Sequence, residues 1–380
     1  MNTKSENDIL VYGVGDIAPD RDDPDTLFVH VKDLLNRGDV VFGQLETTLS
    51  HRGSRLPQAR HTVRVEPKAA VALRDAGFKV ISFAGNHCMD WGREAFFDTI
   101  ESIEEQKISV IGVGKNIEEA RRPEIFEIKG TKIAFLAYNS ILPMAYWAEV
   151  DRPGCVPLRS WTIYEQIEHD QPGTPCRIHT YPHREDFMEM KNDIKKAKSE
   201  NDIVILSMHW GIHLVPAQLA DYQREVAMAA IDCGADLILG HHAHILKGIE
   251  IYEGKVIMYS LCNFALDLPF PEGHEESPAF KEIQVLNPSW KPDPEYPTYT
   301  MPPDSRKTMI AKCVISDKSI KSVSFLPAII NKSSQPMVLK ATDKQFEEVL
   351  QYMEEVTKDQ GLNTEFVIDD DEVVIKRIGA

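Results

Sequence analysis

The sequence predicts an α/β fold, because strand-like and helix-like segments alternate along most of its 380 residues. Two further observations support this prediction. The strand-like segments are apolar throughout, which is typical of a buried sheet covered by helices on both faces. Glycine and polar residues gather where these segments end, and open α/β sheets bind their ligands at that edge. A chain of this length can form one large domain with additions, or two domains.

The clearest alternation lies in the first 140 residues. One helical pattern there ends at Gly77, a residue that is common just after a helix because it readily adopts positive φ. The last strand-like segment of this region leads directly into a proline-rich stretch. Strands are expected at 8–14, 40–46, 78–87, 109–114 and 132–140, and helices at 26–37, 66–77 and 92–106.

The same alternation returns after residue 183. The tail adds one amphipathic helix and a pair of strands around the acidic turn 369–371. We therefore expect a main domain at 1–330 and a C-terminal helix–strand extension at 331–380. Further strands are expected at 202–208, 235–239, 255–261 and near 308–316, with helices at 184–198 and 217–233.

Two proline-rich regions interrupt the alternation. Residues 143–183 are too long for an idle turn, and we expect them to form a functional lid or substrate loop. Trp147 and Trp161 in this segment are either substrate contacts or packing residues. Residues 268–304 are expected to form an irregular excursion before the next strand.

The charge and cysteine content limit the partners and the compartment. The net charge is −17, so a nucleic-acid backbone or an anionic membrane is not expected as a partner. No run of about 18 apolar residues is present, and the first residues lack the pattern of a secretory signal, so no membrane anchor is expected. The six cysteines are scattered without a CxxC pair, which predicts free thiols in a reducing cytoplasm.

Carboxylate, amide and imidazole side chains come at the ends of five predicted strands. Parallel neighbouring strands would bring these ends together at one edge, so residues scattered in sequence would form one cluster. Carboxylates and imidazoles together suit divalent Mn, Fe, Co or Zn, and a carboxylate can bridge two ions about 3.5–4 Å apart. The residues are Asp16, Glu46, Asn86, His209, His242 and His244.

Some of the residues in these motifs have a simpler interpretation when they are taken alone. Asp16 after a glycine is typical of a turn, and Glu46 could be a charge at a helix start. His87 alone would more often be structural. The run GHHAH at 240–244 is harder to explain as core or as solvated surface, because it places three histidines within four positions. The shared placement at strand ends favours a two-metal site.

The order of several motifs resembles that of the CapA family, which is named for capsule poly-γ-glutamate synthesis and belongs to the calcineurin-like metallophosphoesterase superfamily. The resemblance covers about residues 8–267 and implies a four-layer α/β/β/α sandwich, with two facing sheets flanked by helices. The motifs are GD at 15–16, GDVVFGQLE at 38–46, AGNHCMDWG at 84–92, HWG at 209–211, GHHAHILKGIE at 240–250 and YSLCNF at 259–264.

The resemblance also implies a role for each motif residue. His87 matches the histidine that protonates the leaving group or stabilises the transition state. Asp90 matches a position that could orient His87 or the nearby loop. The implied metal ligands are Asp16 and His244 for the first ion, Asn86, His209 and His242 for the second, and Glu46 as the bridge between them.

The sequence departs from the family pattern near the site. Ala18 stands where the superfamily has a histidine ligand, which would weaken the first metal position. Gln44 replaces a frequent asparagine, and His213 replaces a frequent glutamate, so both could alter substrate choice. His241 has no implied role, and it is either a contact of the site or substrate or a surface histidine.

Three functions follow as expectations. The first is a metal-dependent hydrolase, in which a metal-activated water attacks a small-molecule or γ-glutamyl-type ester or amide and His87 assists the leaving group. The second is an enzyme or accessory protein of poly-γ-glutamate synthesis. The third is a metal-containing binding protein without turnover.

Overall fold

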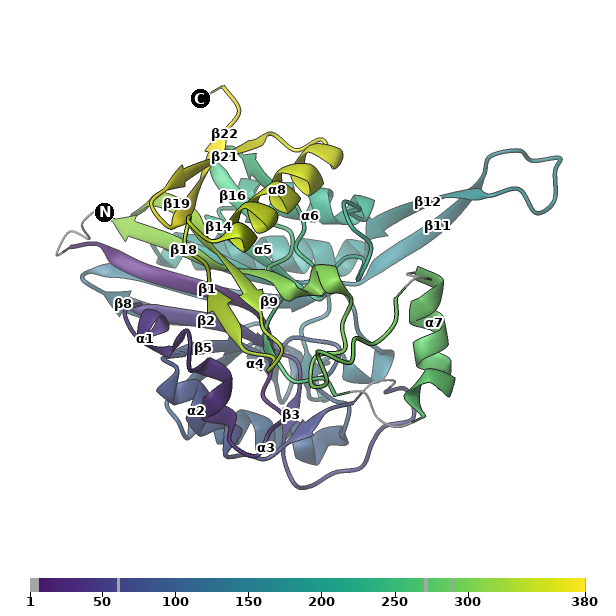
Figure 1. Ribbon diagram of the computed structural model, residues 1–380, viewed down its shortest axis with the longest axis horizontal. Coiled ribbons are helices and arrows are strands. Elements are labelled where there is room, and N and C mark those ends of the chain that lie inside the picture. The colour runs from purple at the N-terminus through teal and green to yellow at the C-terminus, as the bar shows by residue number, and fades with distance from the viewer. Residues whose placement is uncertain (1–6, 60–61, 270–272, 287, 289, 380) are drawn as a thin grey trace.

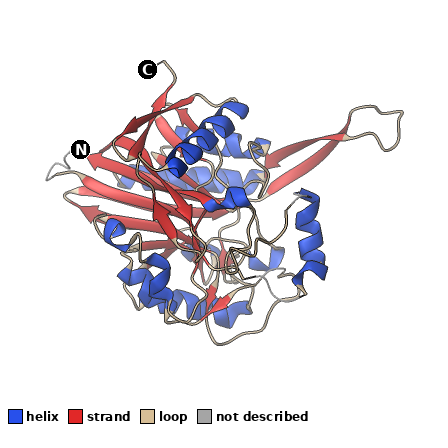
Figure 2. Ribbon diagram, viewed as in Figure 1, coloured by secondary structure: helices blue, strands red, loops and turns tan. Residues whose placement is uncertain are grey.

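The computed structural model describes residues 7–59, 62–269, 273–286, 288 and 290–379 and has a mixed α/β fold (Figures 1 and 2). The predicted α/β class is confirmed. Two large sheets form its centre, so the single sheet that the alternation alone predicted is wrong. Apolar strands are equally buried when one face packs on helices and the other on a second sheet, so the pattern does not distinguish the two cases.

The first sheet has ten strands. Its order is β21-β22-β19-β18-β1-β2-β5-β6, with β17 paired to β1 and β20 paired to β19. The strands from β1 to β6 in this order are parallel, and the others down to β21 are antiparallel. The bounds are β1 (Ile9–Ala18), β2 (Val40–Leu45), β5 (Val80–Ser82), β6 (Ser109–Ile111), β17 (Asn263–Leu266), β18 (Lys307–Ser316), β19 (Ser319–Ile330), β20 (Pro336–Val338), β21 (Thr364–Asp369) and β22 (Glu372–Arg377).

The second sheet has six strands in the order β15-β16-β14-β13-β9-β8. Its four central strands are parallel, and β15 and β8 close the edges in antiparallel pairs. The sequence did not predict β8, whose residues alternate in exposure as an edge strand's do. The bounds are β8 (Glu124–Ile128), β9 (Thr131–Asn139), β13 (Ile203–His209), β14 (Leu237–His241), β15 (Ile249–Tyr252) and β16 (Lys255–Met258).

Helices and short strand pairs complete the fold (Figure 1). The helices are α1 (Lys32–Leu35), α2 (Ala69–Asp75), α3 (Gly92–Glu104), α4 (Ile117–Ala120), α5 (Arg184–Glu200), α6 (Asp221–Asp232), α7 (Pro278–Leu286) and α8 (Lys344–Asp359). The short pairs are β3 (Thr48–Leu49) with β4 (Arg64–Val65), β7 (Val113–Gly114) with β10 (Gly154–Cys155), and β11 (Ser160–Gln166) with β12 (Cys176–Pro182). The 3-10 turns are η1 (Pro24–Phe28), η2 (Met144–Tyr146), η3 (His274–Glu276) and η4 (Pro303–Arg306).

The two sheets share one hydrophobic core. Phe42 of β2 stacks on Phe135 of β9 with ring centroids 6.1 Å apart and planes 7° apart. Phe126 of β8 packs edge-on against Phe135 at 5.8 Å. A Cβ on Gly13 of β1 would lie 2.8 Å from the side chain of Leu239 on β14, so glycine allows this close approach of the sheets.

Replacing Phe135 with alanine should destabilise the protein strongly. Its side chain is 1% exposed and lies between the sheets, so the change removes buried apolar surface and leaves a cavity. We expect a loss of about 3–5 kcal/mol in the free energy of unfolding, measured by urea titration. The matched control is Phe97→Ala, at a side chain 38% exposed, which should cost much less. Equal losses in the two variants would contradict the shared core.

Helices cover both sheets. Met190 of α5 and Val226 of α6 belong to the same buried cluster as Leu206 of β13, so these helices pack on the second sheet. Phe96 of α3 stacks on Phe83, just after β5, at 5.9 Å, so α3 packs on the first sheet. Burial on both sides explains why the strands are apolar throughout.

The prediction of one helix at 26–37 is wrong. The chain forms the turn η1 and the four-residue α1, separated by Val31, whose φ of −124° is not helical. Phe28 packs edge-on against Phe78 at 5.8 Å, and Leu35 is also fully buried. The helical spacing of the apolar residues therefore reflects their burial in the same core. Tertiary contacts determine that the helix is interrupted at Val31.

The tail follows its prediction. It forms α8 and the β21–β22 pair, and β22 joins the first sheet beside β19. All six cysteines are free. Within the described ranges, none of the helices has both the length and the apolar character needed to cross a membrane.

Candidate metal centre

The candidate ligands lie where strands of both sheets end. The sequence placed Asp16 after its strand, but β1 continues to Ala18, and the register of β1 with its neighbours shifts at Asp16. Such irregularities turn a side chain out of the regular alternation and are common beside active sites. The other residues lie at or beyond strand ends as predicted: Glu46 follows β2, Asn86 lies beyond β5, His209 ends β13, and His242 and His244 follow β14.

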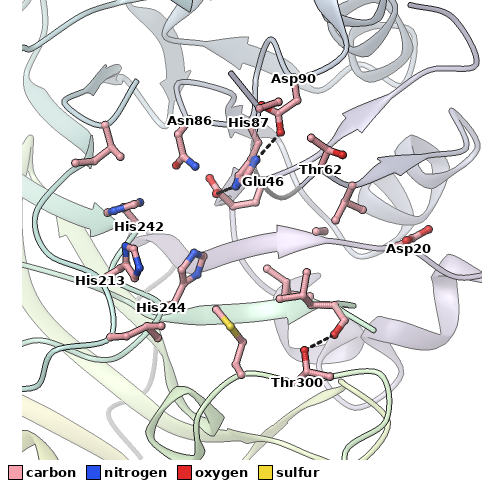
Figure 3. Close-up of a pocket in the computed structure, with 18 of the residues that line it drawn as sticks. Asp20, Glu46, Thr62, Asn86, His87, Asp90, His213, His242, His244 and Thr300 are labelled. Atoms are coloured by element: carbon pink, nitrogen blue, oxygen red, sulfur yellow. Dashed lines mark hydrogen bonds and ion pairs between the residues drawn. The ribbon is translucent and has the colours of Figure 1, made fainter. Parts of the chain in front are cut away.

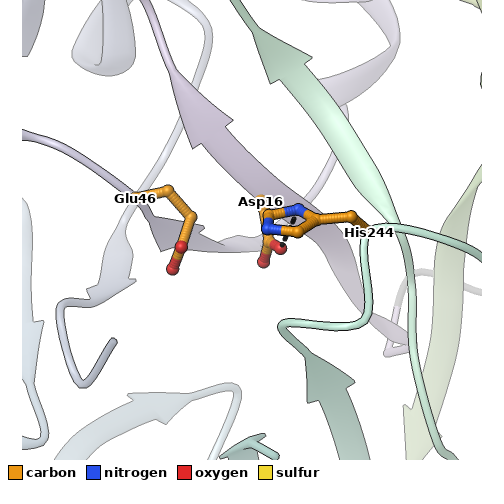
Figure 4. Close-up of side chains that lie close together, drawn as sticks. All are labelled: Asp16, Glu46 and His244. Carbon is orange, nitrogen blue, oxygen red and sulfur yellow. Dashed lines mark ion pairs between the residues drawn. The ribbon is translucent and has the colours of Figure 1, made fainter. Parts of the chain in front are cut away.

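Asp16, Glu46 and His244 form the first cluster (Figure 4). Each offers a ligand atom within 4.8 Å of those of the other two. Nδ1 of His244 lies 3.4 Å from Oδ2 of Asp16 and 2.7 Å from Oδ1 of Asn263. Because Nδ1–H donates to Asn263, Nε2 of His244 keeps the lone pair that a metal ion needs.

Glu46, Asn86, His209 and His242 form the second cluster. Nε2 of His209 lies 2.7 Å from Oδ1 of Asn86, and Nδ1 of His209 lies 3.5 Å from Oε1 of Glu46. The His209 and His242 rings are 5.0 Å apart between centroids. Glu46 thus belongs to both clusters, which is the position that a bridging carboxylate takes in a two-metal site.

The electrostatics of the two clusters favour a bound cation. Burial and the neighbouring Asp16 charge raise the pKa of Glu46 well above its ordinary value. Burial lowers the pKa of His209 to about 3 and that of His242 well below its ordinary value, so both imidazoles are neutral and available as ligands. Buried polar atoms normally have partners. Four ligand atoms at this centre have no hydrogen-bond partner among the described residues: Asp16 Oδ1, Glu46 Oε2, His209 Nδ1 and His242 Nδ1.

The backbone at this centre is constrained to present the ligands. His242 and His244 have φ values of 82° and 54°, in the left-handed region that costs energy for residues other than glycine. A Cβ on Gly85 would lie 2.7 Å from Oε1 of Glu46, so glycine leaves room for that carboxylate. The fold therefore holds the candidate ligands in place against local strain.

His87 lies next to the centre and is held by two further residues. Its Nε2 is 3.9 Å from Oε2 of Glu46, and its Nδ1 is 2.6 Å from Oδ2 of Asp90. Tyr146 donates its hydroxyl to Oδ1 of Asp90 at 2.7 Å. Burial opposes protonation of His87, but Asp90 outweighs it and raises the pKa of His87 to about 9. At neutral pH this imidazolium is a proton donor pointed at the metal centre.

A cavity of about 780 Å³ opens beside the centre (Figure 3). Glu46, Asn86, His87, His242 and His244 all line it, together with apolar residues from several loops. A pocket of 300–1,000 Å³ suits a small molecule. The arrangement can therefore place such a molecule against the ligand clusters and the imidazolium.

Three residues considered as substrate contacts lie elsewhere. Trp161 is 60% exposed on the projecting β11–β12 hairpin, and Trp147 lies under the guanidinium of Arg159 at 4.6 Å. Neither lines the cavity. His241 is fully buried, which excludes a surface histidine, and its Nδ1 lies 3.5 Å from Oδ1 of Asp16. His241 therefore contacts a ligand candidate, and it is absent from the cavity wall.

The three residues that depart from the family pattern, Ala18, Gln44 and His213, all lie at or beside the candidate metal centre. Ala18 lines the cavity, so the missing histidine leaves apolar wall there. Gln44 is fully buried and donates from Nε2 to Oε1 of Glu46 at 3.2 Å. His213 lines the cavity, with its ring 5.4 Å from that of His242.

Sequence reasoning missed two residues that hold the centre in place. Asn263 accepts from His244 and donates from Nδ2 to the hydroxyl of Tyr299 at 2.7 Å. Its place in the YSLCNF motif was the available signal. Tyr146 lies in the proline-rich region and hydrogen-bonds to Asp90. In that region the sequence pointed to the two tryptophans as the candidate contacts.

Replacing Asn263 with alanine should weaken the first metal position. The change frees Nδ1 of His244 and no longer fixes which ring nitrogen faces the cluster. We expect metal affinity to fall about 10-fold to 100-fold, measured by titrating the metal-free protein with Mn²⁺. Asn331→Ala, whose amide contacts only residues 333–337 near its own turn among the described residues, is the control and should bind metal normally. Unchanged affinity in Asn263→Ala would remove this residue from the centre.

Comparison with known proteins places these residues in a family. Residues 8–268 match the model described as "Bacterial capsule synthesis protein PGA_cap". The "PGA biosynthesis protein CapA" of Bacillus subtilis (strain 168) is 28% identical over 278 residues, which cover 70% of this chain and 66% of that protein. The "Capsule biosynthesis protein CapA" of Bacillus anthracis is 27% identical over 246 residues, which cover 64% and 54%.

One further sequence relative and one solved structure are also similar to this chain. A "Probable polyglutamine synthesis accessory protein" of Mycobacterium tuberculosis (strain ATCC 25618 / H37Rv) is 27% identical over 245 residues, covering 62% of this chain and 58% of that protein. A hypothetical protein from Thermus thermophilus superposes with a TM-score of 0.46 at 15% identity, covering 84% of this chain and 98% of that one. The chain spans less than two thirds of the length of the sequence relatives described here. The family match includes every candidate ligand, and the chain belongs to the bacterial capsule synthesis protein PGA_cap family.

Proposed function

We propose that the protein is a metal-dependent hydrolase that holds two divalent cations, Mn, Fe or Zn, and acts on an ester or amide. One observation carries the proposal: Glu46 belongs to two clusters of buried ligand atoms, and atoms of both clusters lack hydrogen-bond partners among the described residues. Carboxylate, amide and neutral imidazole ligands suit these metals. Asp16, Glu46 and His244 would hold one ion, and Glu46, Asn86, His209 and His242 the other.

When bound, the metal pair supplies Lewis acidity and lowers the pKa of a water so that it is nucleophilic near neutral pH. His87 gives its proton to the departing oxygen or nitrogen of the substrate. Asp90 orients the His87 ring and keeps it protonated, and Tyr146 holds Asp90 in turn. The cavity wall beside the reacting group is mainly apolar.

The fold is in keeping with this assignment. Two sheets that share a core, each with helices packed on it, suit the four-layer α/β/β/α sandwich of the calcineurin-like metallophosphoesterase superfamily. We include this finer fold and superfamily placement in the proposal. The first metal position has one ligand fewer than the superfamily pattern because Ala18 offers none, so we expect its ion to bind more weakly.

A second function is favoured by the relatives. The names of two of them refer to PGA or capsule biosynthesis and that of a third to polyglutamine synthesis. This chain could therefore act in making or trimming a γ-linked glutamate polymer. A hydrolase centre is compatible with trimming, so the two proposals differ in substrate and share the metal centre.

The experiment measures bound metal and turnover on the same preparation. The full chain is stripped with a chelator, reloaded with Mn²⁺ or Zn²⁺, and assayed on a phosphomonoester, a phosphodiester and a γ-glutamyl anilide. We expect up to two ions per chain and metal-dependent turnover of at least one substrate. His242→Ala should lose the second ion, whereas His51→Ala, at an exposed histidine, should keep it. Bound metal without turnover of any substrate would favour a metal-containing binding protein.

A further inference from the structure

The cavity beside the candidate metal centre is lined by two kinds of residue. Polar candidate ligands form one part, which we call the floor, and mainly apolar residues form the rest, which we call the wall. The floor carries the candidate ligands Glu46, Asn86, His242 and His244. In Figure 3 these side chains lie together at one side, while Thr300 and Asp20 lie away from them. The volume of about 780 Å³ leaves room for a substantial group beyond the reacting atoms.

The wall is mainly apolar. Its residues come from five separate places in the chain, so the apolar surface is built by several loops beside the candidate ligands. Such a wall favours a group that loses little by leaving water, because burying apolar area is favourable and burying an unpaired charge is costly. The apolar residues that carry this argument are Val63, Leu142, Leu266, Leu268, Trp290 and Met301.

The described part of the wall also carries a few charged residues, of both signs. Among the described residues that line the cavity, Asp20, Asp267 and Glu282 are carboxylates, and Arg55 and His87 carry positive charge. Asp267 is paired with Arg21, outside the wall, at 2.5 Å. Arg55 is exposed and donates from Nη2 to the carbonyl of Ala59 at 2.7 Å. A chain of glutamyl carboxylates would leave water for a wall that is mainly apolar, and burying charge there is costly.

We infer that the substrate is a small molecule with a sizeable apolar group, aromatic or branched aliphatic, next to the bond that is broken. Its negative charge is confined to the group that faces the metals. This inference rests on the proposed metal centre and deepens it by naming the substrate class. It distinguishes the first proposed function from the second, because a γ-linked glutamate polymer carries charge along its length and has no large apolar group.

Non-hydrolysable ligands test the inference apart from turnover. Benzylphosphonate and methylphosphonate carry the same metal-binding group and differ in apolar area. On Mn²⁺-loaded full-length protein, calorimetry should show benzylphosphonate binding about 10-fold to 100-fold more tightly. Oligo-γ-glutamate should compete poorly with it. Equal affinity for the two phosphonates, or tighter binding of the oligomer, would overturn the inference.

Variants assign the preference to the wall. Met301→Ala should reduce the benzyl preference about threefold to tenfold without changing bound metal, and Leu142→Ala should act in the same direction. Met144→Ala is the matched control, because Met144 is 69% exposed and lies outside the cavity. A preference unchanged in both wall variants would overturn the inference. A preserved preference with no hydrolysis of any ester or amide would count against the hydrolase proposal alone.

Discussion

Replacing Glu46 with glutamine should abolish most metal binding and lower turnover about 1,000-fold, because Glu46 is shared by both ligand clusters. The change keeps the shape of the side chain and its contact with Gln44. It removes only the negative charge that would bridge two cations. Bound metal is measured by elemental analysis, and turnover is measured on the best substrate of the panel.

The same variant separates a lost ligand from a damaged fold. In the metal-free protein, burial and Asp16 make the Glu46 carboxylate unfavourable, so its neutral replacement should unfold at the same temperature or a higher one. The rise in melting temperature on adding Mn²⁺ should disappear. Glu200→Gln, at the exposed end of α5, is the control. Glu46→Gln protein with normal metal content would falsify the bridging assignment.

Replacing His87 with asparagine should lower turnover about 100-fold to 10,000-fold on substrates with poor leaving groups. His87 lies 3.9 Å from Glu46 and carries a proton at neutral pH because Asp90 stabilises the imidazolium. A nitrophenolate leaves without needing that proton, whereas an alkoxide needs it. The loss should therefore be small for nitrophenyl esters and large for alkyl esters, measured as kcat/KM along a leaving-group series.

Two related variants sharpen this test. Asp90→Asn should cost less than His87→Asn and show the same dependence on the leaving group, because Asp90 acts through His87. Tyr146→Phe removes one hydrogen bond to Asp90 and should have the smallest effect of the three. A uniform loss across all leaving groups would mean that His87 positions the substrate and does not donate a proton.

Most of the candidate centre was predictable from the sequence. Side chains that follow parallel apolar strands meet at one edge, so the sequence alone groups Glu46, Asn86 and His209. The histidine run that contains His242 and His244 strengthened the grouping. Asp16 was found for the same reason, although it lies within β1 at a register shift.

Other features depend on contacts between residues distant in sequence. Asn263 accepts a hydrogen bond from His244 because β17 pairs with β1. No local sequence pattern predicts that pairing. The helix predicted at 26–37 is broken because burial of Phe28 and Leu35 in the core outweighs helix propensity. The tryptophans of the proline-rich region lie outside the cavity because local composition does not reveal the direction in which a hairpin projects.

The sequence by itself determined the α/β class, the strand-end positions of the candidate ligands and the family, because hydrophobic period and motif order are local properties of the chain. Tertiary structure alone decided three things: that two sheets share one core, that Glu46 stands between two clusters, and that the cavity beside it has a mainly apolar wall. Each depends on which faces meet in space, and a buried face has the same composition whatever covers it.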